Sequence, residues 1–333
     1  MGLHLNIKSA WIRILLALAV LTFFGGCRQP VVTELAKQTI DRDTTWSGVI
    51  VINGDIYIPP GVTLTIAPGT IIKFRKIDET SDQNLFHTDS PYYPEAELII
   101  RGRLIARGTP DSRIVFTSAE MTPRPADWGA INFLGSDGNI LEYVKIYCAY
   151  NGIHAHGGSV DVSHSEFARN GVGISFKKEE ETPDAPWFGK PSKLKISRSV
   201  FTNNKGGIGF RNSTAEITHN EIRDNKFFGI WPREDSDALI TYNEITGNQR
   251  GVFLFQARGL RLEYNNIYNN RTYDIAIAEA QDFPVHAAHN WFGTTSREKI
   301  AAMLFDSSDD PELAEIGIEP VLEQPVDWKK DKL

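Results

Sequence analysis

The 333-residue sequence has only two cysteines, Cys27 and Cys148. Two cysteines are too few for a disulfide framework or a cysteine-rich zinc module. Basic residues are also scarce, because 35 Lys and Arg stand against 42 Asp and Glu, which gives a formal net charge of -7. A chain with this balance and no basic tract is poorly suited to neutralise phosphates, so we expect no nucleic-acid partner. The remaining composition is that of a globular protein, which excludes collagen-like and wholly disordered chains.

An apolar run near the N-terminus is too short to span a membrane. Ile14–Phe24 has about 11 residues, whereas a spanning helix needs roughly 20. Lys8 and Arg13 lie at its N-terminal side, and two glycines and Cys27 follow it. A basic flank, a short apolar core and small residues are typical of an export signal, so we predict a signal peptide over residues 1–26.

The cysteine after this run resembles the lipid-attachment residue of a bacterial lipobox, although Phe24 stands where that motif usually has Leu. The resemblance implies cleavage before Cys27, a membrane-anchoring lipid on that residue, and a tether over residues 27–43. It also implies export to the bacterial cell envelope, in the periplasm or at the outer membrane. The alternative is a plain secretory signal with an incidental cysteine.

The body of the sequence is a repeat array. Seven similar segments start at Val144, Ser165, Ser199, Asn220, Asn243, Asn265 and Asn290, with spacings of 21, 34, 21, 23, 22 and 25 residues. Each unit holds short runs with apolar residues at period two, which indicates strands. A unit of about 22 residues with three short strands cannot bury its own apolar face, so neighbouring units must stack. We therefore predict an all-β parallel β-helix, in which each coil adds one strand to three parallel sheets.

Asparagines recur at two fixed positions of the repeat. One column contains Asn220, Asn243, Asn265 and Asn290, and the other contains Asn170, Asn204, Asn225, Asn248 and Asn270. Asparagine tolerates left-handed backbone angles at tight turns, and stacked amides can pair from coil to coil. We expect both columns to form such ladders.

The N-terminal half has looser repeats, in which alternating apolar residues run between Pro-Gly corners. Two insertions interrupt the array, at 75–95 and 177–193. Residues 296–305 predict a short helix that seals the last coil, with Ser296 as its N-cap, and residues 316–322 predict a closing strand. We therefore assign 44–322 to one β-helix and 323–333 to a C-terminal tail.

The Asn-ladder repeats, the stretch TLTIAPGTIIKF and the closing NWFGTT segment resemble exported right-handed parallel β-helix proteins of the pectin-lyase-like fold. The resemblance covers about 44–322. Members of this fold commonly use one strand face as a polysaccharide cleft. Three catalytic motifs are missing: the polygalacturonase Asn-Thr-Asp series, the epimerase Asp-Pro-His-Asp and the lyase Arg-x-Pro-x-x-Arg.

Alternation along the strands places two columns of side chains on one outer face. The first column is His154, Ser175, Gly209, Trp231, Phe253 and Ala276, and the second is His156, Lys177, Arg211, Arg233, Phe255 and Ala278. Aromatic faces can stack on sugars, and cations can hold their carboxylates. The predicted ligand contacts are Trp231, Phe253, Phe255, Arg211, Arg233 and Trp187. The alternative is that these aromatics simply pack beneath the insertion at 177–193.

Catalytic residues are not defined by any motif, so Arg211, Arg233 and Lys177 are candidates through their charge alone. His154 and His156 project from one strand face and are weak candidates for a copper or zinc site, because no third ligand is evident. The copper-processing family called NosD shares this fold. Cys148 follows an apolar strand and is expected to be buried.

These observations lead to one main hypothesis and two alternatives. The main hypothesis is an envelope lipoprotein that binds polysaccharide or another envelope component without turnover. The first alternative is a polysaccharide lyase or glycoside hydrolase that acts along the strand face at 153–256. The second is NosD-like metal handling. We predict no cofactor and a monomeric protein.

Overall fold

The computed structural model describes residues 32–77, 95–278 and 281–330. The predicted signal peptide, Cys27 and most of the insertion at 75–95 lie outside these ranges, so the expectations about them stay predictions. Nearly all regular structure in the described part is strand, and its one helix is α2 (Arg297–Ala301). No helix in these ranges is long and apolar enough to cross a membrane.

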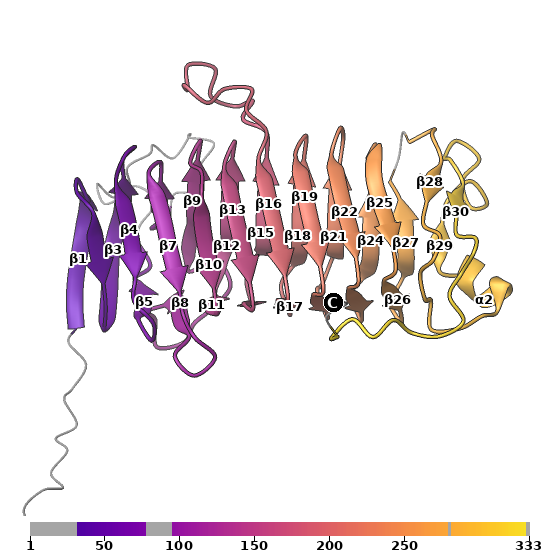
Figure 1. The fold of residues 1–333 in the computed structure, drawn as a ribbon, viewed down its shortest axis with the longest axis horizontal. Coiled ribbons are helices and arrows are strands. Elements are labelled where there is room, and N and C mark those ends of the chain that lie inside the picture. The colour runs from indigo at the N-terminus through magenta and orange to yellow at the C-terminus, as the bar shows by residue number, and fades with distance from the viewer. Residues whose placement is uncertain (1–31, 78–94, 279–280, 331–333) are drawn as a thin grey trace, which may run out of the picture. The chain divides into compact units, whose positions relative to one another are not determined.

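The strands lie in three parallel stacks, and consecutive strands of the chain enter the stacks in turn (Figure 1). The first stack contains β5 (Ile71–Phe74), β8 (Ile114–Ser118), β11 (Val144–Tyr147), β14 (Glu166–Ala168), β17 (Val200–Thr202), β20 (Glu221–Arg223), β23 (Glu244–Thr246) and β26 (Asn266–Tyr268). The second contains β6 (Leu98–Ile100), β9 (Trp128–Leu134), β12 (Ala149–His156), β15 (Val172–Lys177), β18 (Gly206–Arg211), β21 (Phe228–Arg233), β24 (Arg250–Leu254), β27 (Tyr273–Ile277) and β29 (Leu304–Phe305). The third contains β2 (Thr44–Trp46), β4 (Thr63–Ile66), β7 (Arg103–Arg107), β10 (Asn139–Glu142), β13 (Ser159–Ser163), β16 (Lys193–Ser197), β19 (Thr214–Thr218), β22 (Asp237–Thr241) and β25 (Gly259–Glu263).

The predicted parallel β-helix is therefore confirmed, with one difference in the sheets. Strand β3 (Val49–Ile58) pairs with β5 through its first half and with β6 through its second half. This continuous strand joins the first two stacks, so the structure has one 19-stranded and one nine-stranded sheet where three sheets were expected. The coils still stack strand upon strand, because every pairing is parallel, with register shifts only between β1 and β3 and between β9 and β12 among the described strands.

The core lies inside the coils and is filled by the side chains at every second position of each strand, which point inward. Strand β8 has the burial pattern of alternating inward and outward residues that the period-two sequence predicts. Like residues stack on each other between coils: the ring centroids of Phe167 and Phe201 are 4.8 Å apart, and those of Phe176 and Phe210 are 4.9 Å apart. These distances match the spacing of neighbouring strands, so the repeat itself aligns the core.

Both asparagine ladders are present and buried. The side-chain nitrogen of Asn220 donates to the side-chain oxygen of Asn243 at 3.0 Å, and the nitrogen of Asn225 donates to the oxygen of Asn248 at 2.8 Å. The left-handed backbone angles belong to the residue before each ladder asparagine, as at His219 (φ 59), and this corrects the expectation that the asparagines themselves adopt them.

The two ends of the array differ from the sequence-based boundaries. Strand β1 (Val32–Thr39) pairs with β3, so part of the predicted tether already belongs to the sheet. Helix α2 has the expected N-cap, because the Ser296 side chain accepts a hydrogen bond from the backbone of Lys299. It is shorter than predicted, and β29 follows it. The closing strand is β30 (Ile316–Gly317), which pairs with β28 (Val285–His286).

The C-terminal segment after β30 runs back along the coils (Figure 1). Val326 exchanges two hydrogen bonds with the side chain of Asn266 on β26, at 2.7 and 2.9 Å. The predicted tail is therefore attached to the first stack over the part that the structure describes. Cys148 is a free, buried thiol, as its position after an apolar strand indicates.

Candidate ligand-binding site

The two outward columns have the register that the sequence predicts. In the first column, His154 pairs with Ser175, Ser175 with Gly209, and Gly209 with Trp231. In the second column, the pairs are His156 with Lys177, Lys177 with Arg211, and Arg211 with Arg233, and an isolated bridge adds Phe255 beside Arg233. The repeats therefore gather these side chains on the outer face of the second stack.

A hollow of about 350 Å³ lies on this face, which is within the usual size range of ligand pockets. Its floor is made by Ser175 and Gly209, the two small residues of the first column. Aromatic side chains and cations surround the floor. The complete lining is Ala126, Tyr150, Gly171, Val172, Ser175, Lys205, Gly209, Phe227, Phe228, Trp231 and Arg233.

Glycines in β18 allow the aromatic wall of the hollow, formed by Phe227, Phe228 and Trp231, to approach the sheet. A Cβ atom on Gly206 would lie 2.2 Å from the tip of the Phe228 ring, so only glycine leaves room for this ring. A Cβ atom on Gly209 would lie 3.4 Å from the same ring, which is an ordinary contact. Gly206 therefore serves the packing of the wall, whereas Gly209 keeps the floor of the hollow open.

Trp231 is held in place by other aromatic rings. Its ring is stacked on Phe253, with centroids 5.4 Å apart, and meets Phe227 edge to face at 5.8 Å. Phe228 packs against it at 5.1 Å. Phe253 therefore supports Trp231 from the neighbouring coil and does not line the hollow. Phe255 also lies outside the lining, so the predicted contact at this residue has no counterpart in the hollow.

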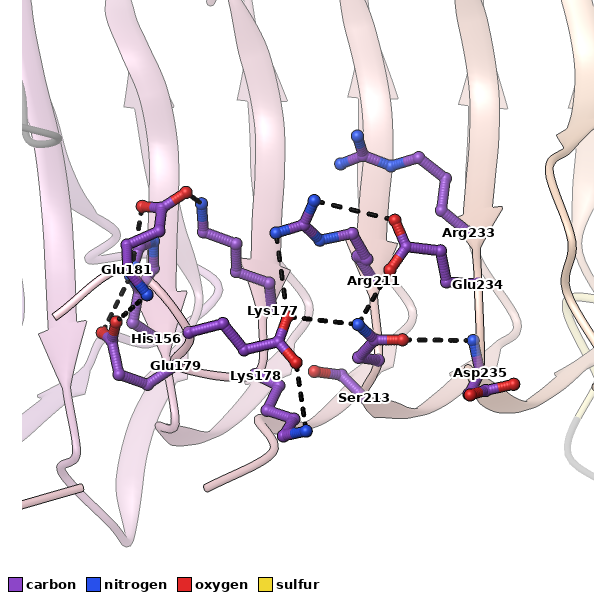
Figure 2. Close-up of polar contacts among 12 residues, drawn as sticks. His156, Lys177, Lys178, Glu179, Glu181, Arg211, Ser213, Arg233, Glu234 and Asp235 are labelled. Carbon is purple, nitrogen blue, oxygen red and sulfur yellow. Dashed lines mark hydrogen bonds and ion pairs between the residues drawn. The ribbon is translucent and has the colours of Figure 1, made fainter. Parts of the chain in front are cut away.

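The three predicted cations have different environments (Figure 2). Lys177 forms an ion pair with Glu181. Arg211 lies between Glu180 and Glu234, with nitrogen–oxygen distances of 3.9 and 3.6 Å. Both side chains are thus neutralised by partners of the protein itself, which makes them poor candidates for the capture of an anion.

Arg233 is the cation that remains available. Within the described chain, its guanidinium group makes no ion pair and no hydrogen bond, and its carbon lies 4.5 Å from the centroid of Trp231. Burial, together with the charge of Arg211, lowers the pKa of Arg233 against the opposing effect of Glu234. The Nε atom of Arg233 and the Nε1 atom of Trp231 are both buried donors without a partner among the described residues. A cation in this setting favours an anionic ligand that accepts hydrogen bonds.

The insertion at 177–193 leaves this hollow uncovered and folds toward earlier coils. Its Trp187 ring packs on Gly135, where an added Cβ would lie 2.6 Å from the ring, and Arg101 stacks on the same ring at 4.1 Å. The insertion appears in Figure 1 as the long excursion between β15 and β16. Trp187 and the other residues of the insertion lie outside the lining of the Trp231 hollow, so the predicted contact at Trp187 has no counterpart there, and the aromatic residues of the hollow do not pack beneath the insertion.

The insertion is tied to the coils by Glu179. This buried carboxylate receives hydrogen bonds from His156 at 3.1 Å, from Trp187 at 3.2 Å, and from the backbone of Thr182 at 2.8 Å. Burial raises its pKa, but the hydrogen bonds from His156 and from the backbones of Thr182 and Glu181 outweigh that effect and lower the pKa of Glu179 to about 2. The ionised carboxylate thus fixes the loop.

His154 and His156 belong to a buried polar chain. The two Nε2 atoms are 3.0 Å apart, and the Nδ1 atom of His154 lies 3.3 Å from the side-chain oxygen of Asn132. Burial lowers the pKa of His154, and the charges of His156 and Lys177 lower it further. In residues 32–77, 95–278 and 281–330, no group of three or more His, Cys, Asp or Glu side chains is arranged to hold a metal ion.

The lining of the hollow is mainly aromatic and cationic. Among the described residues that line the hollow, none carries a carboxylate or an imidazole. Sequence reasoning missed Tyr150, Lys205, Phe227 and Phe228, because they precede the two columns in the repeat. The alignment of the repeats could have identified Tyr150 and Phe227. Asn151 pairs with Val172 and Gly206 pairs with Phe228, and Tyr150 and Phe227 each lie one residue before these aligned positions.

A second hollow, of about 400 Å³, lies on the outer face of the nine-stranded sheet. Its lining alternates cations with carboxylates, and Lys195 already pairs with Glu216 at 3.8 Å. It has no aromatic side chain in its lining, so it lacks the combination of a stacking face and an available cation that the Trp231 hollow has.

Residues 188–305 match the family model described as a right handed beta helix region. This chain is a right-handed parallel β-helix protein. No curated protein matches the sequence of this β-helix. Among solved structures, a mutant of the periplasmic alginate epimerase AlgG is 14% identical, with a TM-score of 0.48, over 89% of this chain and 78% of that one. The A-module of the mannuronan C-5 epimerase AlgE6 from Azotobacter vinelandii is 11% identical, with a TM-score of 0.44, over 90% of this chain and 86% of that one.

Proposed function

We propose that this β-helix protein is exported and binds an acidic polysaccharide in the Trp231 hollow without converting it. The observation that supports this most strongly is the Arg233 guanidinium group, which lies in an aromatic hollow without a counter-ion from the described chain. A sugar carboxylate supplies the missing anion, and its two oxygens match the fork of a guanidinium group. The neighbouring indole offers a flat apolar face to the sugar ring.

The form of the hollow also suits an extended chain. Tyr150 lies at one end and Phe227 at the other, three coil steps away, which is about 14 Å at 4.8 Å per step. The floor between them is low because its outward residues are Ser175 and Gly209. Lys205 adds a second, exposed cation at the rim. Successive acidic sugars along the hollow would meet aromatic and cationic groups in turn.

Binding without turnover is favoured because proton abstraction needs a positioned base. Among the described lining residues, none carries a carboxylate or an imidazole, and the nearby His154 is buried, with its Nε2 atom 3.0 Å from that of His156. A lyase or hydrolase at 153–256 therefore has less support than a binding site.

Location at the cell envelope rests on the sequence. The export signal over 1–26 and the lipobox-like Cys27 favour a lipid-anchored protein, for which a polysaccharide of the envelope is an accessible partner.

The test is calorimetric titration of the full exported protein with oligogalacturonates, and with their methyl esters as uncharged controls. Arg233→Gln is expected to weaken binding about ten- to hundredfold, the equivalent of 1.5–3 kcal/mol for hydrogen bonds to a charged group. Arg211→Gln is the matched control, and it should change affinity only slightly because Glu180 and Glu234 already occupy that guanidinium group.

Two results would overturn the proposal: no binding of any uronate oligomer, or unchanged affinity in Arg233→Gln. Unsaturated sugars or new reducing ends released during the titration would instead establish the lyase or hydrolase alternative.

A further inference from the structure

A second tryptophan–arginine pair lies on the same outward column as Arg233. Arg101 directly follows β6, and its guanidinium carbon lies 4.1 Å from the centroid of Trp187. The register of Ile100 with Phe133 places Arg101 beside Leu134, and Leu134 pairs with His156. From His156 the column continues to Arg233, so the two arginines are five coil steps apart, or about 24 Å.

The environment of Arg101 repeats that of Arg233. Within the described ranges, its guanidinium group makes no ion pair or hydrogen bond, and its Nε atom is buried without a partner. A shallow depression of about 460 Å³ surrounds it and is lined by Arg101, Gly135, Pro186, Trp187, Phe188, Gly189 and Lys190. Phe188 is 50% exposed at its edge. An available cation and exposed aromatic surface therefore occur together at a second place.

The insertion holds this second pair rigidly. The Trp187 nitrogen donates to Glu179, whose carboxylate is also fixed by His156. Lys190 donates to the Gly135 backbone at 3.2 Å and pairs with Asp137 at 2.7 Å, which attaches the far side of the loop. The loop is thus bound on both sides, so Trp187 is presented on a fixed surface.

Ion pairs occupy the strip between the two pairs (Figure 2). Its cations are each paired with a carboxylate: Lys177 with Glu181, Lys178 with Glu180, and Arg211 with both Glu180 and Glu234. A further carboxylate, Glu179, is buried beneath the loop. The cations of the strip are thus occupied by carboxylates of the protein, and the cations without such a partner among the described residues are Arg101 and Arg233 at its two ends.

We propose that Arg101 and Trp187 form a second subsite for the same acidic polysaccharide, with Glu179 as a positioning residue. This inference rests on the proposed function of the Trp231 hollow. It adds that the preferred ligand is a long chain, because both subsites can be occupied only by an oligomer of about six or more sugars if each sugar advances by about one coil step. When one subsite holds the oligomer, the rest of the oligomer stays at a high effective concentration near the other subsite. The oligomer therefore binds more tightly although each sugar makes no additional contact.

The test compares a trimer and an octamer of galacturonate, titrated into the full protein. We expect the wild type to bind the octamer at least about tenfold more tightly than the trimer. Arg101→Gln and Trp187→Leu should remove this gain and leave the trimer affinity unchanged. Arg107→Gln, which removes an exposed cation from the nine-stranded sheet, is the matched control for net charge and should keep the gain.

The outcomes separate the two proposals. If the trimer binds through Arg233 but the octamer gains nothing, or keeps its gain in Arg101→Gln, the second subsite is refuted and the proposed function stands. If neither oligomer binds, the proposed function fails and the second subsite falls with it. Glu179→Gln should reduce the gain only partly, and protection of the loop from protease should fall in parallel, as expected for a positioning residue.

Discussion

Gly209 and Trp231 are register partners on neighbouring strands, so the position beside the indole carries no side chain. This absence creates the floor of the hollow and leads to a direct test. Gly209→Thr is expected to fold normally, because its Cβ would make only ordinary contacts at 3.4 and 3.6 Å with Phe228. Its side chain would occupy the hollow and weaken oligogalacturonate binding by more than about tenfold, which calorimetry measures.

The matched control for this variant is Gly207→Ala, two residues earlier in β18. Its Cβ would lie 2.2 Å from the backbone oxygen of Gly229, so the coils must shift. We expect a loss of about 1–3 kcal/mol in the free energy of unfolding, measured in urea, from this overpacking. If Gly209→Thr loses as much stability as Gly207→Ala, its effect on binding says nothing about the hollow.

Asn225 lies in the middle of an asparagine ladder and is expected to be sensitive to truncation. Its oxygen accepts hydrogen bonds from the backbone and the side chain of Asn204, and its nitrogen donates to Asn248. Asn225→Ala leaves several buried polar groups unpaired, at about 1–3 kcal/mol each, so unfolding in urea should occur at a clearly lower concentration. The exposed neighbour Lys226, changed to Ala, is the control, and equal effects of the two changes would contradict the role of the ladder.

The ladder of Asn225 ends at a carboxylate. Asp274 is buried and accepts two hydrogen bonds from Asn270, yet burial raises the pKa of Asp274 from 3.8 to about 6. The folded protein therefore holds this proton more tightly than the unfolded chain, and stability is lost as pH rises from about 3.8 through 6.

Asp274→Asn should accordingly stabilise the fold above pH 6, on the order of 2 kcal/mol, because an amide replaces the carboxylate without charge. The gain should shrink as the pH falls below 6 and be small at pH 4, because the carboxyl is protonated in both the folded and the unfolded state only below its unfolded pKa of 3.8. Thermal unfolding of both proteins between pH 4 and 8 measures this difference, and a gain that is independent of pH would contradict the assignment.

Glu179 is expected to give the opposite dependence on pH. Its pKa is lowered to about 2, so its contribution to stability is present above the unfolded value of 4.5 and is lost as pH falls toward 2. We expect the loop around Trp187 to become sensitive to an acid protease over this range. Glu179→Gln should show that sensitivity already at pH 5, with little further change on acidification.

The sequence predicts the coil architecture well because the fold is local and repetitive. Each coil repeats the period-two pattern and the Asn positions, so aligning Asn220 with Asn243 also aligns their strands. The outward columns follow from the same register, which is why the neighbours of Trp231 could be named in advance.

Other parts of the site could not be predicted, because they depend on contacts outside the repeat. The insertion has no register of its own, so the position of Trp187 on Gly135 requires the folded loop. The difference between Arg211 and Arg233 likewise depends on where Glu180 and Glu234 lie in space. Strand β3 turns the first corner without interruption, and for that reason two large sheets replace the expected three.

The parallel register has a consequence for how far the molecule can reach. Because each coil contacts only its neighbours, coils can be added or removed without changing the rest of the array. The separation of Arg101 and Arg233 is therefore counted in coils, and the array acts as a molecular ruler. Duplicating the coil that begins at Ser199 and ends before Asn220 would lengthen this ruler by one step of about 4.8 Å, so the shortest oligomer that spans both arginines would grow by about one sugar.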